Sequence, residues 1–356
     1  MAAQAGILLA IIFFGMLFFS IPIAICIVAA SFVTLTALLT LDFGVFVSAQ
    51  KLITGMDSFT LLAVPFFILA GLFMSNGGIA QKLINLAQIF VGRIPGSLAL
   101  ANVAGNAMFG SISGSGIAAA TAIGGVLGPI EKENGYDRAY SAAVNISTAP
   151  VGQLIPPTAA FIVYSLASGG TSIAALFIAG WIPGLLWAFA CALVAWYYAK
   201  KHNYVARTSG FNAKEAFHAF IDAIPSLFLI VIIIGGITGG IFTATEAAGI
   251  AVAYTFILSV FFYKTIKVSD IPKLLTETAV MTSVIMLIIG ASSVMSFVMS
   301  FTGIPTAISK MILSISDNPI IILLIINILL LIIGTFMDVA PALLIFTPIL
   351  LPIAVQ

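Results

Sequence analysis

Three serines, each separated from the next by one residue, interrupt a long apolar stretch of the chain. They are Ser111, Ser113 and Ser115, and glycines flank them at Gly110 and Gly116. Hydroxyl and carbonyl oxygens suit a hard monovalent cation, and irregular backbone is tolerated at bilayer depth where protein shields it or where it lines a cavity. The spacing therefore predicts a Na⁺ site.

Helix packing is the alternative explanation for this composition, because glycines four residues apart let helices approach closely. For Gly124, Gly128 and Gly235 we favour that explanation, and for the serines we favour the ion site. The serines have no neighbouring acid or histidine that would activate a nucleophile, and the glycine-rich stretch lacks the lysine of a phosphate-binding loop. The motif thus indicates ion binding and not catalysis.

A second interruption follows, where three prolines and a glycine break an apolar run, namely Pro150, Gly152, Pro156 and Pro157. Proline removes a backbone donor and clashes with the preceding turn, so a helix must break here and free carbonyl oxygens. We expect these carbonyls to join the serine hydroxyls in one oxygen cage. The half-helix that begins near Pro157 has a positive N-terminal end, which favours a carboxylate. The residues expected to bind the substrate are Asn145, Thr148, Gly152, Pro156 and Thr158.

A counterpart of the first motif lies near the end of the chain. Asp338 is the only acid within a long apolar run, and an acid at bilayer depth is a functional candidate by default. We expect Gly334, Thr335 and Asp338 to form a partner Na⁺ site. Glu246 resembles it superficially, but Thr243 three residues earlier makes a capping box, so we favour a role for Glu246 in starting a helix.

The composition decides the fold class. The chain has 62% hydrophobic and 7% charged residues, a mean hydropathy of +1.23 and a net charge of +1. A soluble domain carries about 25% charged residues, and a nucleic-acid partner would need a basic face. Apolar runs of helical length recur throughout, which predicts an all-α polytopic membrane protein in contact with the lipid bilayer. Cys26 and Cys191 lie in apolar segments and are interpreted as packing residues.

An internal repeat divides the chain into two halves. The segment from Met74 to Ile79 recurs from Met299 to Ile304, 225 residues later, and asparagines occur at the same separation. The second half stops about 70 residues before the end that the repeat predicts. The predicted halves are residues 1–206, with a re-entrant hairpin at about 95–131 and a broken helix at about 137–168, and residues 207–356, with a hairpin from about 319.

The charges between apolar runs predict the topology. Lysines and arginines cluster at residues 200–214, which places this segment in the cytoplasm. Each arm of the first hairpin is about 16 residues long, too short to cross a bilayer that needs about 20. This hairpin should enter from the cytoplasmic face, and the second from the opposite face. Such an inverted-topology repeat is typical of secondary transporters, and it places the N-terminus in the periplasm or outside the cell.

Four motifs in order resemble the large membrane subunit of tripartite ATP-independent periplasmic (TRAP) transporters. They are Gly110-Ser-Ile-Ser-Gly-Ser-Gly116, Leu154-Ile-Pro-Pro-Thr158, Gly239-Gly-Ile-Phe-Thr-Ala-Thr-Glu-Ala247 and Gly334-Thr-Phe-Met-Asp338. The resemblance covers essentially the whole chain. It implies Na⁺-driven symport of an organic acid across the bacterial inner membrane by an elevator motion.

The resemblance also implies partners and ligands. A periplasmic substrate-binding protein would deliver the acid, and a small four-helix membrane subunit would brace this one. Ser111, Ser115 and the carbonyl region of Pro157 would hold one Na⁺, and Gly334, Thr335 and Asp338 would contribute to another. Na⁺ is the coupling ion, and no other cofactor or metal is expected.

Two other functions remain open from the residues alone. One is a carboxylate or ion transporter of similar inverted-repeat build that needs no binding protein, and the other is a channel or structural membrane subunit. The substrate also remains open, because C4-dicarboxylates, sialic acid and other sugar acids all carry the carboxylate that a helix N-terminus could bind.

Overall fold

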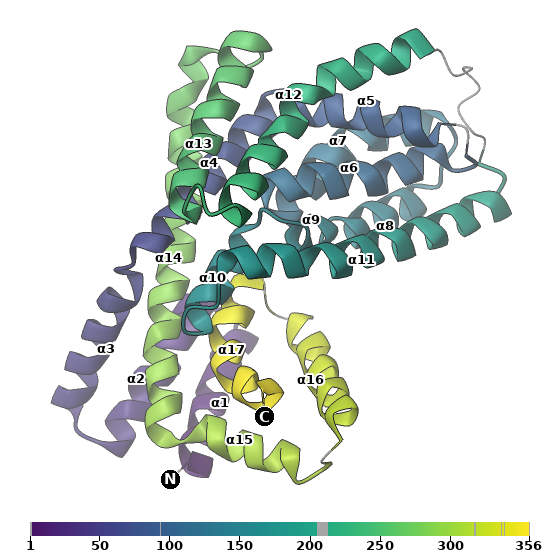
Figure 1. Cartoon of the computed structure of the whole chain (residues 1–356). Coiled ribbons are helices and arrows are strands. Elements are labelled where there is room, and N and C mark those ends of the chain that lie inside the picture. The colour runs from purple at the N-terminus through teal and green to yellow at the C-terminus, as the bar shows by residue number, and fades with distance from the viewer. Residues whose placement is uncertain are drawn as a thin grey trace. The chain divides into compact units, whose positions relative to one another are not determined.

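The computed structural model describes residues 2–92, 94–204, 213–316, 318–335, 337 and 339–355, and these form helices and connecting turns without a strand (Figure 1). Within this part of the chain, five helices are long and apolar enough to cross a membrane, or six if one bent pair counts as a span. A helix pairs its backbone polar groups within one segment, as a bilayer requires. The all-α polytopic membrane protein is confirmed.

The helices gather into two compact units that do not coincide with the two halves of the sequence. One unit comprises residues 1–61, 163–171 and 281–356, and the other comprises residues 62–162 and 172–280. A sequence repeat is defined by the order of residues along the chain, whereas a compact unit is defined by which helices pack together. Each unit contains residues from both halves of the sequence. The repeat boundaries and their inverted orientation stay predictions.

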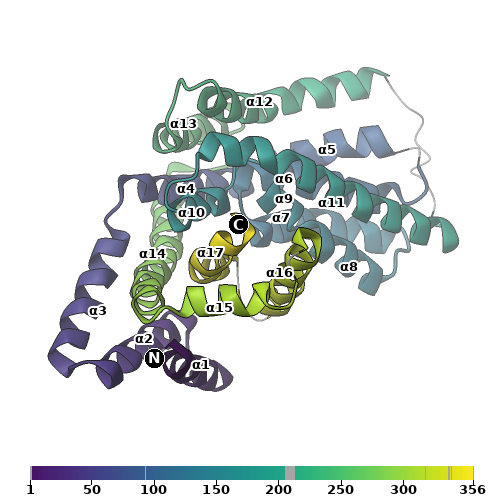
Figure 2. The same cartoon turned by 60° about the horizontal axis from the view of Figure 1, so that its bottom comes forward.

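The first unit begins with α1 packed beside α2, as Figure 1 and Figure 2 show. The next helix starts where Thr40 accepts a hydrogen bond from the Phe43 backbone N–H at 3.4 Å, and Asp42 lies in its first, electropositive turn. The helices of this unit are α1 (Ala2–Phe18), α2 (Ile23–Leu38), α3 (Leu41–Met56), most of α14 (Ile271–Thr302), α15 (Ile304–Leu313), α16 (Pro319–Gly334) and α17 (Val339–Val355).

The second unit contains the first hairpin and the largest buried apolar cluster of the described residues. Fully buried side chains such as Phe109, Ile123 and Phe177 come from three different helices of this unit. Its helices are α4 (Ala63–Asn76), α5 (Ile79–Val91), α6 (Ser97–Ser113), α7 (Gly116–Glu133), α8 (Arg138–Thr148), α9 (Val151–Leu154), the start of α10 (Ala159–Ala167), α11 (Ile173–Lys201), α12 (Ala213–Thr238), α13 (Ala244–Ile257) with a π turn Leu258–Phe262, and the start of α14.

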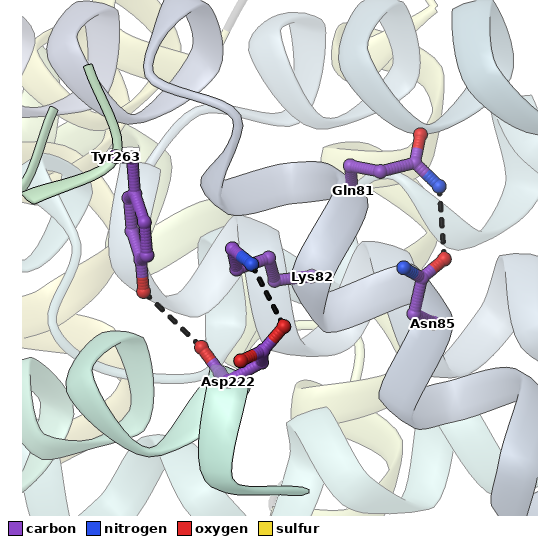
Figure 3. A network of polar contacts seen from close by, with 5 residues as sticks. All are labelled: Gln81, Lys82, Asn85, Asp222 and Tyr263. Carbon is purple, nitrogen blue, oxygen red and sulfur yellow. Dashed lines mark hydrogen bonds and ion pairs between the residues drawn. The ribbon is translucent and has the colours of Figure 1, made fainter. Parts of the chain in front are cut away.

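Helix α5 joins this core through one face and carries polar residues on the other. Its apolar residues are buried, whereas Lys82 points to Asp222 of α12 with a nitrogen–oxygen distance of 3.0 Å (Figure 3). The Tyr263 hydroxyl donates to the Asp222 backbone carbonyl at 3.1 Å, and the Gln81 amide donates to Asn85 at 2.9 Å. Exposed ion pairs contribute little stability, so buried apolar contact holds α5 in place.

Candidate functional site

The tip of the first hairpin lies against the break in the following helix. Gly114, between α6 and α7, has φ +64°, which favours glycine, and a Cβ added there would lie 3.3 Å from the Thr158 Cα and 3.5 Å from the Pro157 carbonyl oxygen. The Thr158 hydroxyl also lies 3.5 Å from the Gly114 carbonyl oxygen. As expected from the sequence, the two polar interruptions meet in space.

The break itself is a bend of 55° between the segments Arg138–Leu154 and Ala159–Ala167. These bounds agree with the predicted broken helix at 137–168. The Thr158 hydroxyl accepts a hydrogen bond from the Ala160 backbone N–H at 3.2 Å and so begins the second segment. Pro156, Pro157 and Thr158 are all buried.

The three serine hydroxyls differ in their local partners. Ser111 donates to the Met108 carbonyl at 2.8 Å, and Ser113 interacts weakly with the Ser115 backbone at 3.4 Å. Ser115 is the N-cap of α7, where its hydroxyl accepts from the Ala118 N–H at 3.2 Å. A hydroxyl that donates its proton keeps two lone pairs, so the Ser111 oxygen can still bind a cation.

Two of the predicted substrate ligands belong to a buried amide network. The Asn106 amide nitrogen shares its two hydrogens among three acceptors, Asn102 Oδ1 at 2.8 Å, Asn145 Oδ1 at 3.0 Å and Thr148 Oγ1 at 2.8 Å. The Asn145 amide in turn donates to the Ala120 carbonyl at 2.8 Å. This network joins α6, α7 and α8 behind the hairpin tip. The substrate role of Asn145 and Thr148 stays a prediction. In the structure, both side chains form hydrogen bonds with residues of the first hairpin.

Gly152, another predicted ligand, packs against Gly110. A Cβ on either residue would overlap the backbone of the other, so the glycines permit α6 and α9 to touch. The packing interpretation of Gly124 is confirmed, because its added Cβ would overlap the Asn145 side chain. The same interpretation is wrong for Gly128 and Gly235 within the described residues, because an added Cβ would meet nothing there within 4 Å.

Sequence reasoning missed Asn102 and Asn106, which are both fully buried. The signal was present, because two asparagines four residues apart in an apolar arm share one face of a helix. The polar region continues to Glu131 near the end of α7, which is 1% exposed and whose Oε1 lacks a hydrogen-bond partner in the described part of the chain. Burial raises the pKa of the Glu131 carboxyl, and the nearby Ser141 and Asn102 side chains offset this by less.

The second predicted ion site is only partly described. Gly334 ends α16 and Thr335 follows it, and the Thr335 hydroxyl donates to the Leu331 carbonyl at 3.0 Å. Both residues are exposed. Asp338 lies outside the described residues. The structure thus places the first hairpin tip beside Pro157 and Thr158, and the ion-binding role of both sets of residues stays a prediction.

The capping interpretation of Glu246 is confirmed. Its Oε2 accepts from both the backbone N–H and the hydroxyl of Thr243 at 2.8 Å, and its own N–H donates to the Thr243 hydroxyl at 3.3 Å. Both cysteines are free thiols. Among the residues that the structure describes, His, Cys, Asp and Glu form no group of three that could hold a metal ion.

The sequence model for "Tripartite ATP-independent periplasmic transporter, DctM component" matches residues 10–356. The chain belongs to this family. The resemblance seen in the four motifs is therefore confirmed, and the chain is a multi-pass membrane component of a tripartite secondary transporter.

Three relatives within the family show how far the similarity extends. The uncharacterized protein YgiK of Salmonella typhimurium is 49% identical over 94% of this chain and 76% of its own length. The C4-dicarboxylate TRAP transporter large permease protein DctM of Rhodobacter capsulatus is 37% identical over 99% of this chain and 81% of its own length. The isethionate TRAP transporter permease protein DctMQ of Oleidesulfovibrio alaskensis is 38% identical over 94% of this chain, which spans 52% of that relative.

Proposed function

We propose that this chain is the permease subunit for sodium-coupled import of an organic acid, such as a C4-dicarboxylate or sialic acid, in the bacterial inner membrane. The observation that carries the proposal is the contact between the Ser111–Ser115 tip and the Pro156–Thr158 break. Two chain interruptions that meet at a buried point concentrate oxygen ligands and a helix N-terminus where substrates of secondary transporters bind.

The oxygen atoms at this contact suit Na⁺ better than a divalent cation. They are hydroxyls and backbone carbonyls, among them the Thr158 hydroxyl 3.5 Å from the Gly114 carbonyl oxygen, and the Pro157 carbonyl oxygen 3.5 Å from where a Cβ of Gly114 would lie. Neutral oxygens carry only partial charges, so they balance one positive charge more readily than two. Na⁺ is thus co-transported cargo in this proposal.

The organic acid would bind at the start of α10. Thr158 caps this segment, and the backbone N–H groups of the first helical turn carry the positive end of the helix dipole. A bound Na⁺ beside this helix end would add a second positive charge, and the acid would bind more tightly with Na⁺ present. Such mutual dependence is the thermodynamic basis of symport.

An elevator motion is supported by the cohesion of the hairpin and the broken helix. The Asn106 amide bonds to side chains of α6 and α8, and Asn145 bonds to α7, so these helices are joined by buried polar contacts. A block held together in this way would move as one body. Gly334, Thr335 and Asp338 would supply a further Na⁺ site in the second hairpin.

A periplasmic substrate-binding protein and a small four-helix membrane subunit complete the proposed assembly, with the N-terminus of this chain in the periplasm. The relatives named DctM and DctMQ support this expectation, because one is called a large permease and the other joins M and Q in its name. The predicted topology places the first hairpin on the cytoplasmic side.

Uptake into proteoliposomes tests this function. The complex of permease, small subunit and binding protein should take up radiolabelled acid only when an inward Na⁺ gradient and the binding protein are both present. A proton gradient or a K⁺ gradient of equal size is the control. Equal uptake without Na⁺ would contradict sodium coupling, and equal uptake without the binding protein would favour the binding-protein-independent transporter.

A further inference from the structure

The first compact unit contains a cavity of about 490 Å³ whose lining is rich in hydroxyl groups. Helix α3 and the turn after it contribute Lys51, Thr54 and Ser58, and α14 contributes Ser292, Ser296 and Ser300. The two helices approach closely beside it, because an added Cβ on Gly55 would overlap Ser293. A volume of this size accommodates a small organic molecule.

The charge of the cavity wall is positive. Lys51 is the only charged residue among the described residues that line it, and aspartate and glutamate are absent from that lining. The Lys51 ammonium nitrogen lies 5.1 Å from the centre of the Phe297 ring, which also lines the cavity. Neither of the two ion pairs found in the described residues involves Lys51. The cavity therefore presents a cation that lacks a counter-ion.

A buried hydroxyl in the same wall also lacks a partner. Ser292 is 1% exposed, and its hydroxyl has no hydrogen-bond partner in the described part of the chain. On the same helix, the buried hydroxyls of Thr278 and Thr302 each donate to the carbonyl four residues earlier at 2.8 Å. Thr282 of the same helix is also unpaired but does not line the cavity. Buried polar groups are normally paired, and Ser292 lines the cavity, so its hydroxyl is free to bond a molecule there.

We propose that this cavity is an anion site that binds a small organic carboxylate, with its charge on Lys51 and its remaining oxygens on the α14 hydroxyls. The residues that line the cavity all belong to the first unit, whereas the residues of the hairpin tip belong to the second. The charge pattern predicts that residues 42–57 lie outside the membrane on the periplasmic side. The identification of the ligand as the transported acid rests on the proposed function. The anion selectivity of the cavity is independent of that function.

Charge-selective labelling tests the cavity without knowledge of its ligand. In a background carrying Cys26→Ala and Cys191→Ala, Ser296→Cys places a thiol in the wall, and Ser314→Cys places one on an exposed residue. The readout is the ratio of the reaction rate with an anionic methanethiosulfonate to the rate with a cationic one. We expect this ratio to be at least about tenfold higher at Ser296→Cys than at Ser314→Cys. Adding Lys51→Gln should abolish this preference. A cationic preference, or an anionic one that survives Lys51→Gln, would overturn the proposal.

Equilibrium binding in sodium-free buffer separates this site from the hairpin site. Succinate, malate and N-acetylneuraminate, which all carry a carboxylate, are the probes, and thermal stabilisation of the purified protein is the readout. At least one probe should stabilise the wild type. In Lys51→Gln, the probe concentration needed for half of the full stabilisation should rise at least about tenfold. Ser111→Ala and the exposed Lys310→Gln should leave it unchanged. If all three probes fail, or if Lys51→Gln binds like the wild type, the anion site is wrong even where sodium-driven uptake holds.

Discussion

Gly110 and Gly152 lie so close that neither can carry a side chain without displacing the backbone of the other. The contact joins α6 of the hairpin to α9 of the broken helix, and the Asn106 carbonyl oxygen lies 3.2 Å from where a Cβ of Gly152 would be. Because both partners are backbone, rotation of a side chain cannot relieve the overlap. The spacing between hairpin and broken helix therefore depends on these two glycines.

Gly152→Ala should destabilise the protein by about 1–3 kcal/mol, the usual cost of overpacking a close contact. Thermal unfolding in detergent measures it. Gly128→Ala is the matched control, because Gly128 lies in the α7 arm of the same hairpin and an added Cβ meets nothing within 4 Å. Alanine is the better helix former, so the control should be neutral or slightly stabilising. A Gly152→Ala protein as stable as the control would contradict the close contact.

Ser111→Ala should raise the Na⁺ concentration needed for half-maximal uptake by about tenfold, because it removes one proposed cation ligand. Uptake at a series of Na⁺ concentrations measures this. Ser314→Ala is the control, since both hydroxyls donate to the carbonyl three residues earlier, Ser111 at 2.8 Å and Ser314 at 2.7 Å, and Ser314 is exposed. An unchanged Na⁺ dependence in Ser111→Ala would remove this serine from the site.

Asn106→Leu should destabilise the protein by about 1–3 kcal/mol, because it leaves buried oxygens of Asn102 and Asn145 without their donor. Chemical or thermal unfolding reports the change. Asn327→Leu is the control, because Asn327, which the repeat pairs with Asn102, is exposed and bonds only the Leu323 carbonyl in the described structure at 2.9 Å. Equal stability of the two variants would show that the network contributes nothing.

Glu131 should make stability depend on pH. Burial raises the pKa of its carboxyl above the ordinary value of 4.5, so the folded protein holds this proton more tightly than the unfolded chain. The contribution of Glu131 to stability is then present in full below the unfolded pKa and is lost as the pH rises to the folded pKa. Glu131→Gln, which stays neutral, should flatten this decline.

Unfolding temperatures measured between pH 4.5 and pH 8, at constant ionic strength, test the role of Glu131. Glu133→Gln is the control, because Glu133 lies two residues further along α7 and is exposed. We expect the control to keep the pH profile of the wild type. If Glu131→Gln also keeps that profile, the buried carboxyl does not titrate differently in the folded protein.

Local chemistry predicted much of the site. Pro156 and Pro157 cannot continue a helix, so the break at this place follows from the sequence alone. The capping box at Thr243 and Glu246 is equally local, because both partners lie within one helical turn. The meeting of hairpin tip and break was also predicted, because the carbonyls freed by the break were expected to join the serine hydroxyls in one oxygen cage.

Contacts between distant segments were beyond the sequence. Asn106 and Thr148 lie 42 residues apart and are hydrogen-bonded, and Gly110 and Gly152, 42 residues apart as well, allow α6 and α9 to approach. The same limit explains the incorrect packing role for Gly128 and Gly235. A glycine pattern indicates that a close neighbour is possible, and only the folded chain decides whether one is present.

The amide network places a constraint on how the family can change. Asn106 supplies the donor that Asn145 and Thr148 both accept, so a substitution at position 106 removes the donor of both partners. A single replacement is costly, whereas a simultaneous exchange for apolar residues of matching shape is nearly neutral. Positions 106, 145 and 148 should therefore covary among relatives, while the surrounding apolar residues drift independently of one another.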